Sequence, residues 1–131
     1  MLVTREMDYM LRILRALHQT EQMSAAAISA QEQIPKATAL KLLKKLHAAG
    51  LVDSRRGADG GYLLRVSCRQ LTLYELFALM EDEIYVNRCQ RPGYVCEKKG
   101  DCGLCRELYR IQEILDVELQ KTPLSTIFQE I

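Results

Sequence analysis

Residues 36–66 read KATALKLLKKLHAAGLVDSRRGADGGYLLRV, and this stretch decides the fold. Its first part mixes leucines and lysines in a pattern typical of a helix with one apolar and one basic side. Gly50 suits the left-handed residue that follows a helix end. Two short β-capable runs, 51–55 and 62–66, then flank a glycine-rich turn. The stretch therefore predicts a helix that ends at about Ala49, followed by a β-hairpin.

Two further helices are predicted before this stretch. Residues 4–18 carry apolar side chains at the three-and-four spacing of one helix face, which predicts that they pack in the core. These side chains are Met7, Met10, Leu11, Leu14 and Leu17. Ser24 is a suitable N-cap for a short alanine-rich helix that ends at Ile34, and Pro35 suits the first position of the helix that follows.

Two more helices are predicted after the hairpin. Thr72 and Glu75 form a capping-box pattern for a helix that runs to about Glu81. Leucine and isoleucine then recur at helical spacing over residues 104–121. Pro123 ends this long helix and leaves a short tail.

Three helices followed by a hairpin is the order of a winged helix-turn-helix, so the expected fold is mainly α-helical with a small β-hairpin. Residues 1–82 are assigned to this winged helix-turn-helix head. Residues 83–103 are assigned to a cysteine-rich loop, because 87–103 contain proline and glycine without a helical period. Residues 104–131 are assigned to the long C-terminal helix and its tail.

Charge is unevenly distributed along the chain, although the formal net charge is only +1. Residues 36–65 carry seven basic and two acidic side chains, whereas residues 71–86 carry four acidic and no basic ones. A lysine-rich helix face is often merely solvated. Segregated charge next to a predicted wing favours a basic face that binds double-stranded DNA instead.

The docking geometry of a winged helix-turn-helix selects the candidate contacts. The second helix of the turn pair lies in the major groove with its N-terminal residues near base edges. Arginine suits a narrow minor groove, so Arg56 is the expected contact from the wing, where glycines allow close backbone approach. The candidate DNA-binding residues are Thr4, Arg5, Lys36, Ala37, Thr38, Lys41, Arg55, Arg56, Gly60 and Gly61.

Four cysteines fall within seventeen residues, in the pattern C-x6-C-x5-C-x2-C. They are Cys89, Cys96, Cys102 and Cys105. The first residues of the chain carry charges and no apolar secretory core, so we expect a cytoplasmic protein. Clustered thiols in that compartment favour metal or redox chemistry over structural disulfides. Cys68 stands apart and is expected to be a small buried residue.

Three hypotheses fit the four thiols. They can hold an iron–sulfur cluster, either [2Fe–2S] or [4Fe–4S], because thiolates are the usual cluster ligands. They can hold structural zinc, which accepts four cysteines tetrahedrally. They can also form a metal-free redox switch, because nearby basic residues favour thiolates. These basic residues are Arg88, Arg91, Lys98 and Lys99.

Other classes fit the sequence poorly. The two histidines lie beside no nucleophile motif, and the chain has no Walker loop, G-x-S-x-G or HExxH pattern, so no enzyme is expected. No apolar run reaches the length of a membrane span. A small iron–sulfur electron-transfer protein remains a more distant alternative, against which the basic helix and wing argue.

The chain resembles the Rrf2 family of bacterial regulators, typified by IscR and NsrR. The resemblance rests on TREMDY at 4–9, LHAAGLV at 46–52, RGADGGYL at 56–63, LTL at 71–73 and the cysteine run before the long final helix. It implies a homodimer that binds a pseudo-palindromic operator, with the helix over 104–120 crossing its partner. It also implies an iron–sulfur cluster that senses iron or cluster supply, nitric oxide or redox stress.

The resemblance leaves two candidates for the fourth cluster ligand beside Cys89, Cys96 and Cys102. IscR-like members have a histidine three positions after the last cluster cysteine, where this chain has Cys105. NsrR-like members use a first-helix aspartate from the partner subunit, and Asp8 stands at that position. Cys105 is preferred because a thiolate is the usual donor.

Overall fold

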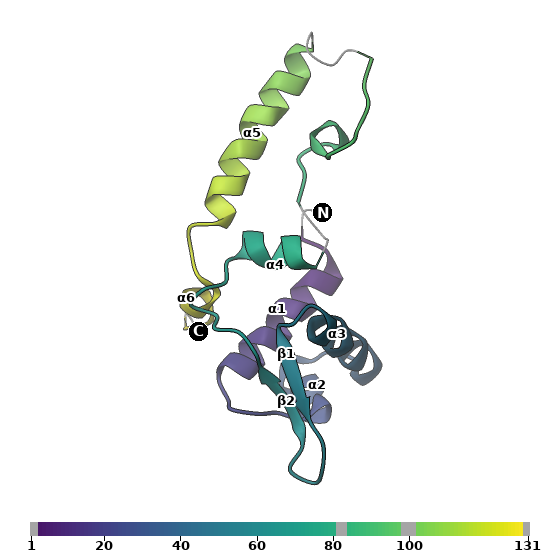
Figure 1. Ribbon diagram of the computed structural model, residues 1–131, viewed down its shortest axis with the longest axis vertical. Helices are drawn as coiled ribbons and strands as arrows, with labels where there is room; N and C mark the ends of the chain where they lie inside the picture. Colours follow the sequence, from purple (N-terminus) through teal and green to yellow (C-terminus); the bar gives the residue numbers. More distant parts are fainter. Residues whose placement is uncertain (1–2, 81–83, 98–101, 130–131) are drawn as a thin grey trace.

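The computed structural model describes residues 3–80, 84–97 and 102–129. It is mostly helical with one antiparallel hairpin, which confirms the expected fold class. The elements in chain order are α1 (Arg5–His18), α2 (Ala25–Glu32), α3 (Lys36–Ala48), β1 (Val52–Arg55), β2 (Gly61–Leu64), α4 (Leu73–Leu79), the 3₁₀ turn η1 (Arg88–Gln90), α5 (Gly103–Leu119) and α6 (Leu124–Gln129). Figure 1 shows α5 running away from the head that the first three helices and the hairpin form.

Local capping signals set the helix boundaries. The Thr4 hydroxyl accepts a hydrogen bond from the Met7 amide at 3.1 Å, and Ser24 does the same for α2. Thr72 and Glu75 form the full capping box at the start of α4. Gly50 follows α3 with a φ of +80°, as its position predicts.

The core of the head is built on the apolar face of α1, which packs against α2 and α3. The predicted methionines of α1 belong to it. Their burial explains the three-and-four spacing, since each turn of α1 contributes one or two apolar side chains to the same side. The largest fully buried side chains are Phe77, Met7, Met10, Ile13, Leu14, Leu17, Ile28, Leu42, Leu43, Leu46, Leu51 and Leu76.

The hairpin pairs β1 with β2 and is attached to the loop before α2. Its register runs from Val52 opposite Leu64 to Arg55 opposite Gly61. The Tyr62 amide donates to the Met23 carbonyl at 2.7 Å, and the reverse bond is 3.0 Å long. A Cβ on Gly61 would lie 2.6 Å from that same Met23 carbonyl oxygen, so this position requires glycine.

The structure corrects the predicted C-terminal tail, which contains the helix α6. Leu124 and Phe128 of α6 are buried in the core of the head. The Leu124 amide donates to the Leu71 carbonyl at 2.8 Å, and the Ser125 amide donates to the Cys68 carbonyl at 3.0 Å. A six-residue helix gains its stability from such tertiary burial, so local sequence gave no signal for it.

Smaller differences concern element boundaries. The predicted loop contains η1, and α5 begins at Gly103 and ends at Leu119. The helix α4 ends at Leu79. Its predicted end, Glu81, lies outside the residues that the structure describes. Among the helices of the described ranges, none is long and apolar enough to cross a membrane.

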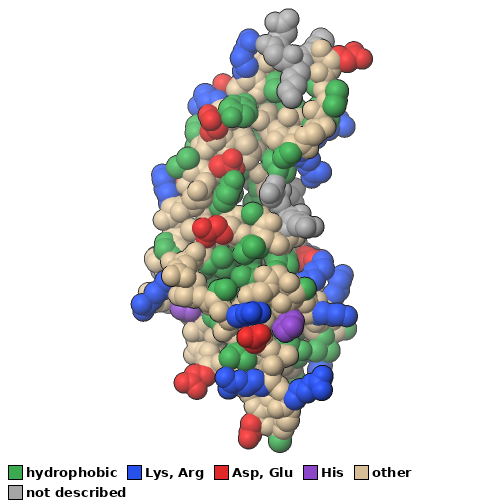
Figure 2. Space-filling model, viewed as in Figure 1, with side chains coloured by type: hydrophobic (Ala, Val, Ile, Leu, Met, Phe, Trp, Pro, Cys, Tyr) green, Lys and Arg blue, Asp and Glu red, His purple; other side chains and the backbone are tan. Residues whose placement is uncertain are grey.

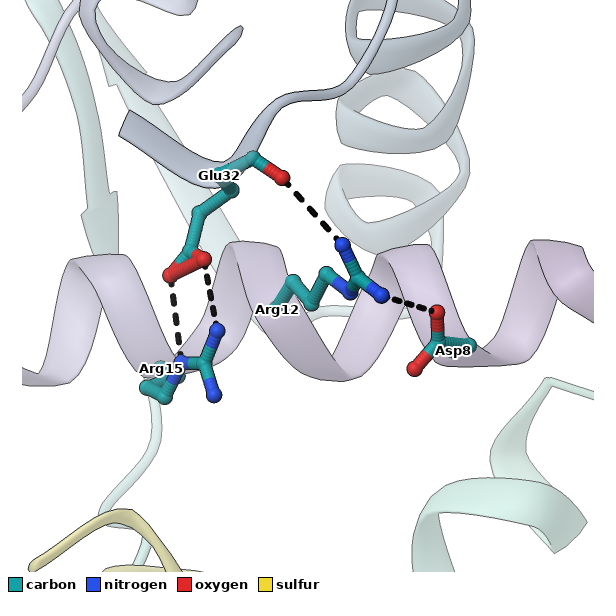
Figure 3. Close-up of polar contacts among 4 residues, drawn as sticks. All are labelled: Asp8, Arg12, Arg15 and Glu32. Carbon is teal, nitrogen blue, oxygen red and sulfur yellow. Dashed lines mark hydrogen bonds and ion pairs between the residues drawn. The ribbon is translucent and has the colours of Figure 1, made fainter. Parts of the chain in front are cut away.

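A partly buried ion pair joins α1 to α2 (Figure 3). The Arg15 guanidinium donates to both carboxylate oxygens of Glu32, at 3.1 Å and 2.7 Å. Arg12 donates to the Glu32 carbonyl oxygen and pairs with Asp8 at 3.0 Å. The Glu32 side chain is only 7% exposed, so the Arg15 guanidinium supplies hydrogen bonds that water does not. The contact therefore adds a polar link between α1 and α2 to their apolar packing.

Replacing Glu32 by glutamine should lower the free energy of unfolding by about 2 kcal/mol. The loss falls below that of a fully buried pair, since the Arg15 side chain is 41% exposed and can regain water. Urea unfolding followed by circular dichroism measures this change. Glu107→Gln is the matched control, because it breaks an exposed ion pair with Arg110 and should leave stability unchanged. Equal free energies of unfolding for the two variants would contradict the stabilising role of the Arg15–Glu32 pair.

Candidate functional site

The first turn of α3 lies on the surface next to the start of α1. Lys36, Ala37 and Lys41 are exposed, and Thr38 is half-buried. Arg5 from α1 joins Thr38 and Lys41 around an open hollow of about 310 Å³. The structure thus brings together DNA-binding candidates that are more than thirty positions apart in the sequence.

Two of the basic and capping residues near this hollow have structural partners. Lys45 forms an ion pair with Glu6 and so ties α3 to α1. The pKa of Glu6 is lowered chiefly by this hydrogen bond, against the opposing effect of burial, and further by the charges of Lys45 and Lys41. Thr4 is the N-cap of α1. Lys36 and Lys41 form no ion pair within the described ranges, so their charges are available to a ligand.

The hairpin tip places the two wing arginines in solvent. Arg55 and Arg56 are exposed, and Gly57 takes a φ of +107° at the turn. The Gln22 amide donates to the Asp59 carbonyl oxygen, which holds the tip against the loop before α2. Figure 2 shows Lys and Arg side chains on both flanks of the lower end of the molecule, where the hairpin lies in Figure 1.

The four predicted cysteines line one pocket of about 190 Å³. Cys89 comes from η1, Cys96 from the segment that follows it, and Cys102 and Cys105 from the start of α5. Cys96 is exposed and the other three are half-buried. The rest of the lining is Asn87, Tyr94, Leu104 and Leu108.

Hydrogen bonds and charge couple the sulfur atoms of this pocket. The amides of Asn87 and Gln90 donate to Cys89 Sγ, at 3.4 Å and 3.2 Å. The pKa of the Cys105 thiol lies above its ordinary value, first because of desolvation and next because it hydrogen-bonds Cys89. The negative charges of the neighbouring thiolates add to this effect.

The donor set suits a soft metal centre. Four thiolates at one pocket are the ligands that iron–sulfur clusters and structural zinc use. Within residues 3–80, 84–97 and 102–129, however, no three His, Cys, Asp or Glu side chains already stand in the arrangement of metal ligands. The thiols therefore share a pocket without forming a finished coordination sphere.

Asp8, the alternative fourth ligand, lies apart from the pocket of its own chain. It pairs with Arg12 and lines a separate hollow between α1, α4 and α6. Asp8 could reach a thiol pocket only in a partner subunit. Its role as a ligand stays a prediction.

Three polar residues were not predicted from the sequence, two that contact a pocket sulfur and one that is buried in α5. Asn87 and Gln90 contact Cys89, and Asn87 also caps η1. Gln112 is the one residue of α5 that is fully buried. Asparagine is a favoured N-cap residue, and this is the signal that could have pointed to Asn87. Nothing in the apolar pattern of α5 singles out Gln112.

Comparisons with known proteins agree on one family. Residues 3–130 match the sequence model of Rrf2, described as an iron-dependent transcriptional regulator. The HTH-type transcriptional regulator IscR of Photorhabdus laumondii is 34% identical over 97 residues, which are 72% of this chain and 57% of that protein. IscR of Vibrio campbellii is 33% identical over 88 residues, which are 66% and 48% of the two chains.

The chain spans about half the length of the curated relatives that it matches. Among solved structures, the global cysteine regulator CymR of Bacillus subtilis superposes with a TM-score of 0.79 and 26% identity, over 98% of this chain and 97% of that one. These relatives are transcriptional regulators and not enzymes. The match covers the head, the thiol pocket and α5, and the chain therefore belongs to the Rrf2 family of transcriptional regulators.

Proposed function

We propose that this chain is a sequence-specific DNA-binding regulator whose operator affinity is controlled by an iron–sulfur cluster bound at the thiol pocket. The observation that carries the proposal is the convergence of Cys89, Cys96, Cys102 and Cys105 on one pocket at the start of α5. When bound, such a cluster would supply a centre that responds to iron supply, nitric oxide or redox stress. The residues of the chain would hold the cluster, bind DNA and form the dimer.

The exposed residues of α1, α3 and the hairpin support DNA binding. Lys36 and Lys41 present charge at the N-terminal half of α3, the part that enters the major groove in this fold class. Arg55 and Arg56 extend from the wing, where a narrow minor groove attracts arginine. Leu40 lies between Lys36 and Lys41 on α3 and is 43% exposed. It adds an apolar surface that can contact thymine methyl groups.

The exposed side of α5 supports a homodimer. Five apolar side chains of this helix are in solvent, and α5 of a second copy would cover them. They are Leu104, Tyr109, Ile111, Ile114 and Val117. A two-fold dimer would bring two recognition helices to a pseudo-palindromic operator, whose half-site spacing matches the protein.

Control of DNA binding follows from the path of the chain. Cys102 and Cys105 belong to the first turn of α5 and its N-cap, and α6 attaches the other end of α5 to the head. A change in the spacing of the four sulfurs would shift α5 and, with it, the distance between recognition helices in the dimer. A coupling free energy of about 1–3 kcal/mol is sufficient for regulation.

A metal-free thiol switch is a second candidate, because Cys89 and Cys105 line the same pocket. Oxidation would join these two sulfurs in a disulfide while the oxidant takes two electrons and two protons leave. Zinc bound by the same four cysteines is a third arrangement of the same site. Iron, zinc and sulfide analysis of protein purified without oxygen separates the three.

Replacing Cys102 by alanine should remove most of the iron and acid-labile sulfide that anaerobic reconstitution loads, because one of four ligands is lost. The variant should also bind an operator duplex with altered affinity. Absorption spectra, iron and sulfide analysis and mobility shifts measure these effects. Cys68→Ala is the matched control, since that buried thiol lies outside the pocket. Cys102→Ala protein that keeps its cluster and its affinity would contradict the proposal.

Replacing Arg56 by alanine should weaken DNA binding and reduce the slope of log affinity against log salt by about one, because one neutralised phosphate charge is lost. Fluorescence anisotropy with a random-sequence duplex over a salt series measures both quantities. Arg110→Ala removes the same charge from α5 and serves as the control. Equal slopes for Arg56→Ala and wild type would argue against a wing contact.

Replacing Ile114 by glutamate should raise the dimer dissociation constant by about tenfold or more, because a charge would be buried between the helices. Sedimentation equilibrium measures the constant. Ile114→Leu keeps the apolar surface and should leave it near the wild-type value. A dimer of unchanged strength in Ile114→Glu would place the interface elsewhere.

A further inference from the structure

Gln112 is a polar residue in the most buried position of α5, with 6% of its surface exposed. Its amide oxygen accepts a hydrogen bond from the Val86 amide at 2.7 Å. Its amide nitrogen donates to the Ile84 carbonyl at 2.9 Å and to the Asp116 carboxylate at 2.8 Å. Both ends of the side chain are therefore paired, and two of the three bonds reach a segment more than twenty-five residues earlier in the sequence.

These two bonds hold the backbone of residues 84–86 on α5, just before the first cysteine. Asn87 follows directly, caps η1 with its side-chain oxygen and donates its side-chain nitrogen to Cys89. The position of Cys89 is thus connected to Gln112 through a short, hydrogen-bonded segment.

Gln112 and Cys105 lie on the same face of α5. They are seven residues apart, close to two full turns, which places Cys105 about 10 Å along the helix from Gln112. Cys89 lies only three residues after Val86, and part of this short link is the turn η1. Such a link can span at most about 10 Å even when fully extended, so the position of Val86 on α5 limits where Cys89 can lie along the helix.

We propose that Gln112 is the positioning residue of the thiol pocket, which holds Cys89 opposite Cys102 and Cys105 and so sets the metal affinity of the four thiols. The inference rests on the proposed function, because it concerns the same pocket. It adds a residue that touches no sulfur. The two Gln112 bonds hold residues 84–86, the segment that leads into Cys89, in place before any ligand binds.

Gln112→Met tests the proposal, because methionine keeps the length and shape of glutamine and removes all three hydrogen bonds. Cobalt(II) is the probe, and its thiolate charge-transfer band reports how many sulfurs bind each ion. We expect cobalt affinity to fall about 10- to 100-fold. The band per bound ion should also weaken. Gln120→Met is the matched control, since Gln120 is an exposed residue of the same region that bonds the Asp116 carbonyl.

A second measurement on metal-free protein separates this inference from the proposed function. In a Cys96→Ser, Cys102→Ser background, equilibration with reduced and oxidised glutathione gives the effective concentration of the Cys89 and Cys105 thiols for one another. Glutathione disulfide accepts the two electrons. Adding Gln112→Met should lower this concentration about tenfold or more. Circular dichroism and thermal unfolding show whether the variant is folded.

Each result decides one of the two claims. Wild-type protein that binds neither cobalt nor iron would overturn the metal centre, and the glutathione equilibrium would then test Gln112 alone. Gln112→Met protein that is folded and keeps wild-type cobalt affinity, band intensity and effective concentration would overturn the positioning role. Loss of cobalt affinity in Gln120→Met as well would assign the effect to α5 in general and overturn the role too.

Discussion

Burial of α6 against the head is the interaction on which the placement of α5 and the thiol pocket depends. Leu124 and Phe128 enter the core that α1 and α4 share, and main-chain bonds to Leu71 and Cys68 fix their depth. The phenyl ring of Phe128 also lies 5.8 Å from the His18 ring at the end of α1. These contacts add to the packing of α4 and Leu119 at the C-terminal end of α5, and together they join this end to the head.

The head therefore holds the C-terminal end of α5, and the thiol pocket lies at its N-terminal end. The helix has 17 residues and is therefore about 25 Å long. Gln112 holds the segment before Cys89 at a point about midway along α5, and α4 contacts α5 near the head. Under the proposed function, a small rotation at the head would become a larger displacement of the sulfurs, and a change at the sulfurs would act on the head through the same helix.

Features encoded within a few residues were predictable from the sequence. Ser24, Thr72 with Glu75, and Gly50 each satisfy backbone groups of their own helix end, so their roles do not depend on the rest of the chain. The cysteine spacing predicted a metal centre; the four thiols do line one pocket, and their role as ligands stays a prediction. The helix α6 and Gln112 were not predictable, because their stability comes from partners distant in the sequence. The spacing of apolar residues in α5 also cannot show that its buried position is Gln112. The side-chain amide of this residue pairs with the backbone N–H of Val86 and the backbone carbonyl of Ile84, which lie outside any helix or strand.

Cys68 gives the molecule an internal reporter. It lies in the core beside α6, and burial raises the pKa of its thiol. Alkylating reagents applied to the native protein will therefore modify the pocket sulfurs and spare this one. Its modification rate, read by mass spectrometry, would measure how often the C-terminal helix leaves the head, and so would follow the transient opening of the junction between α6 and the core.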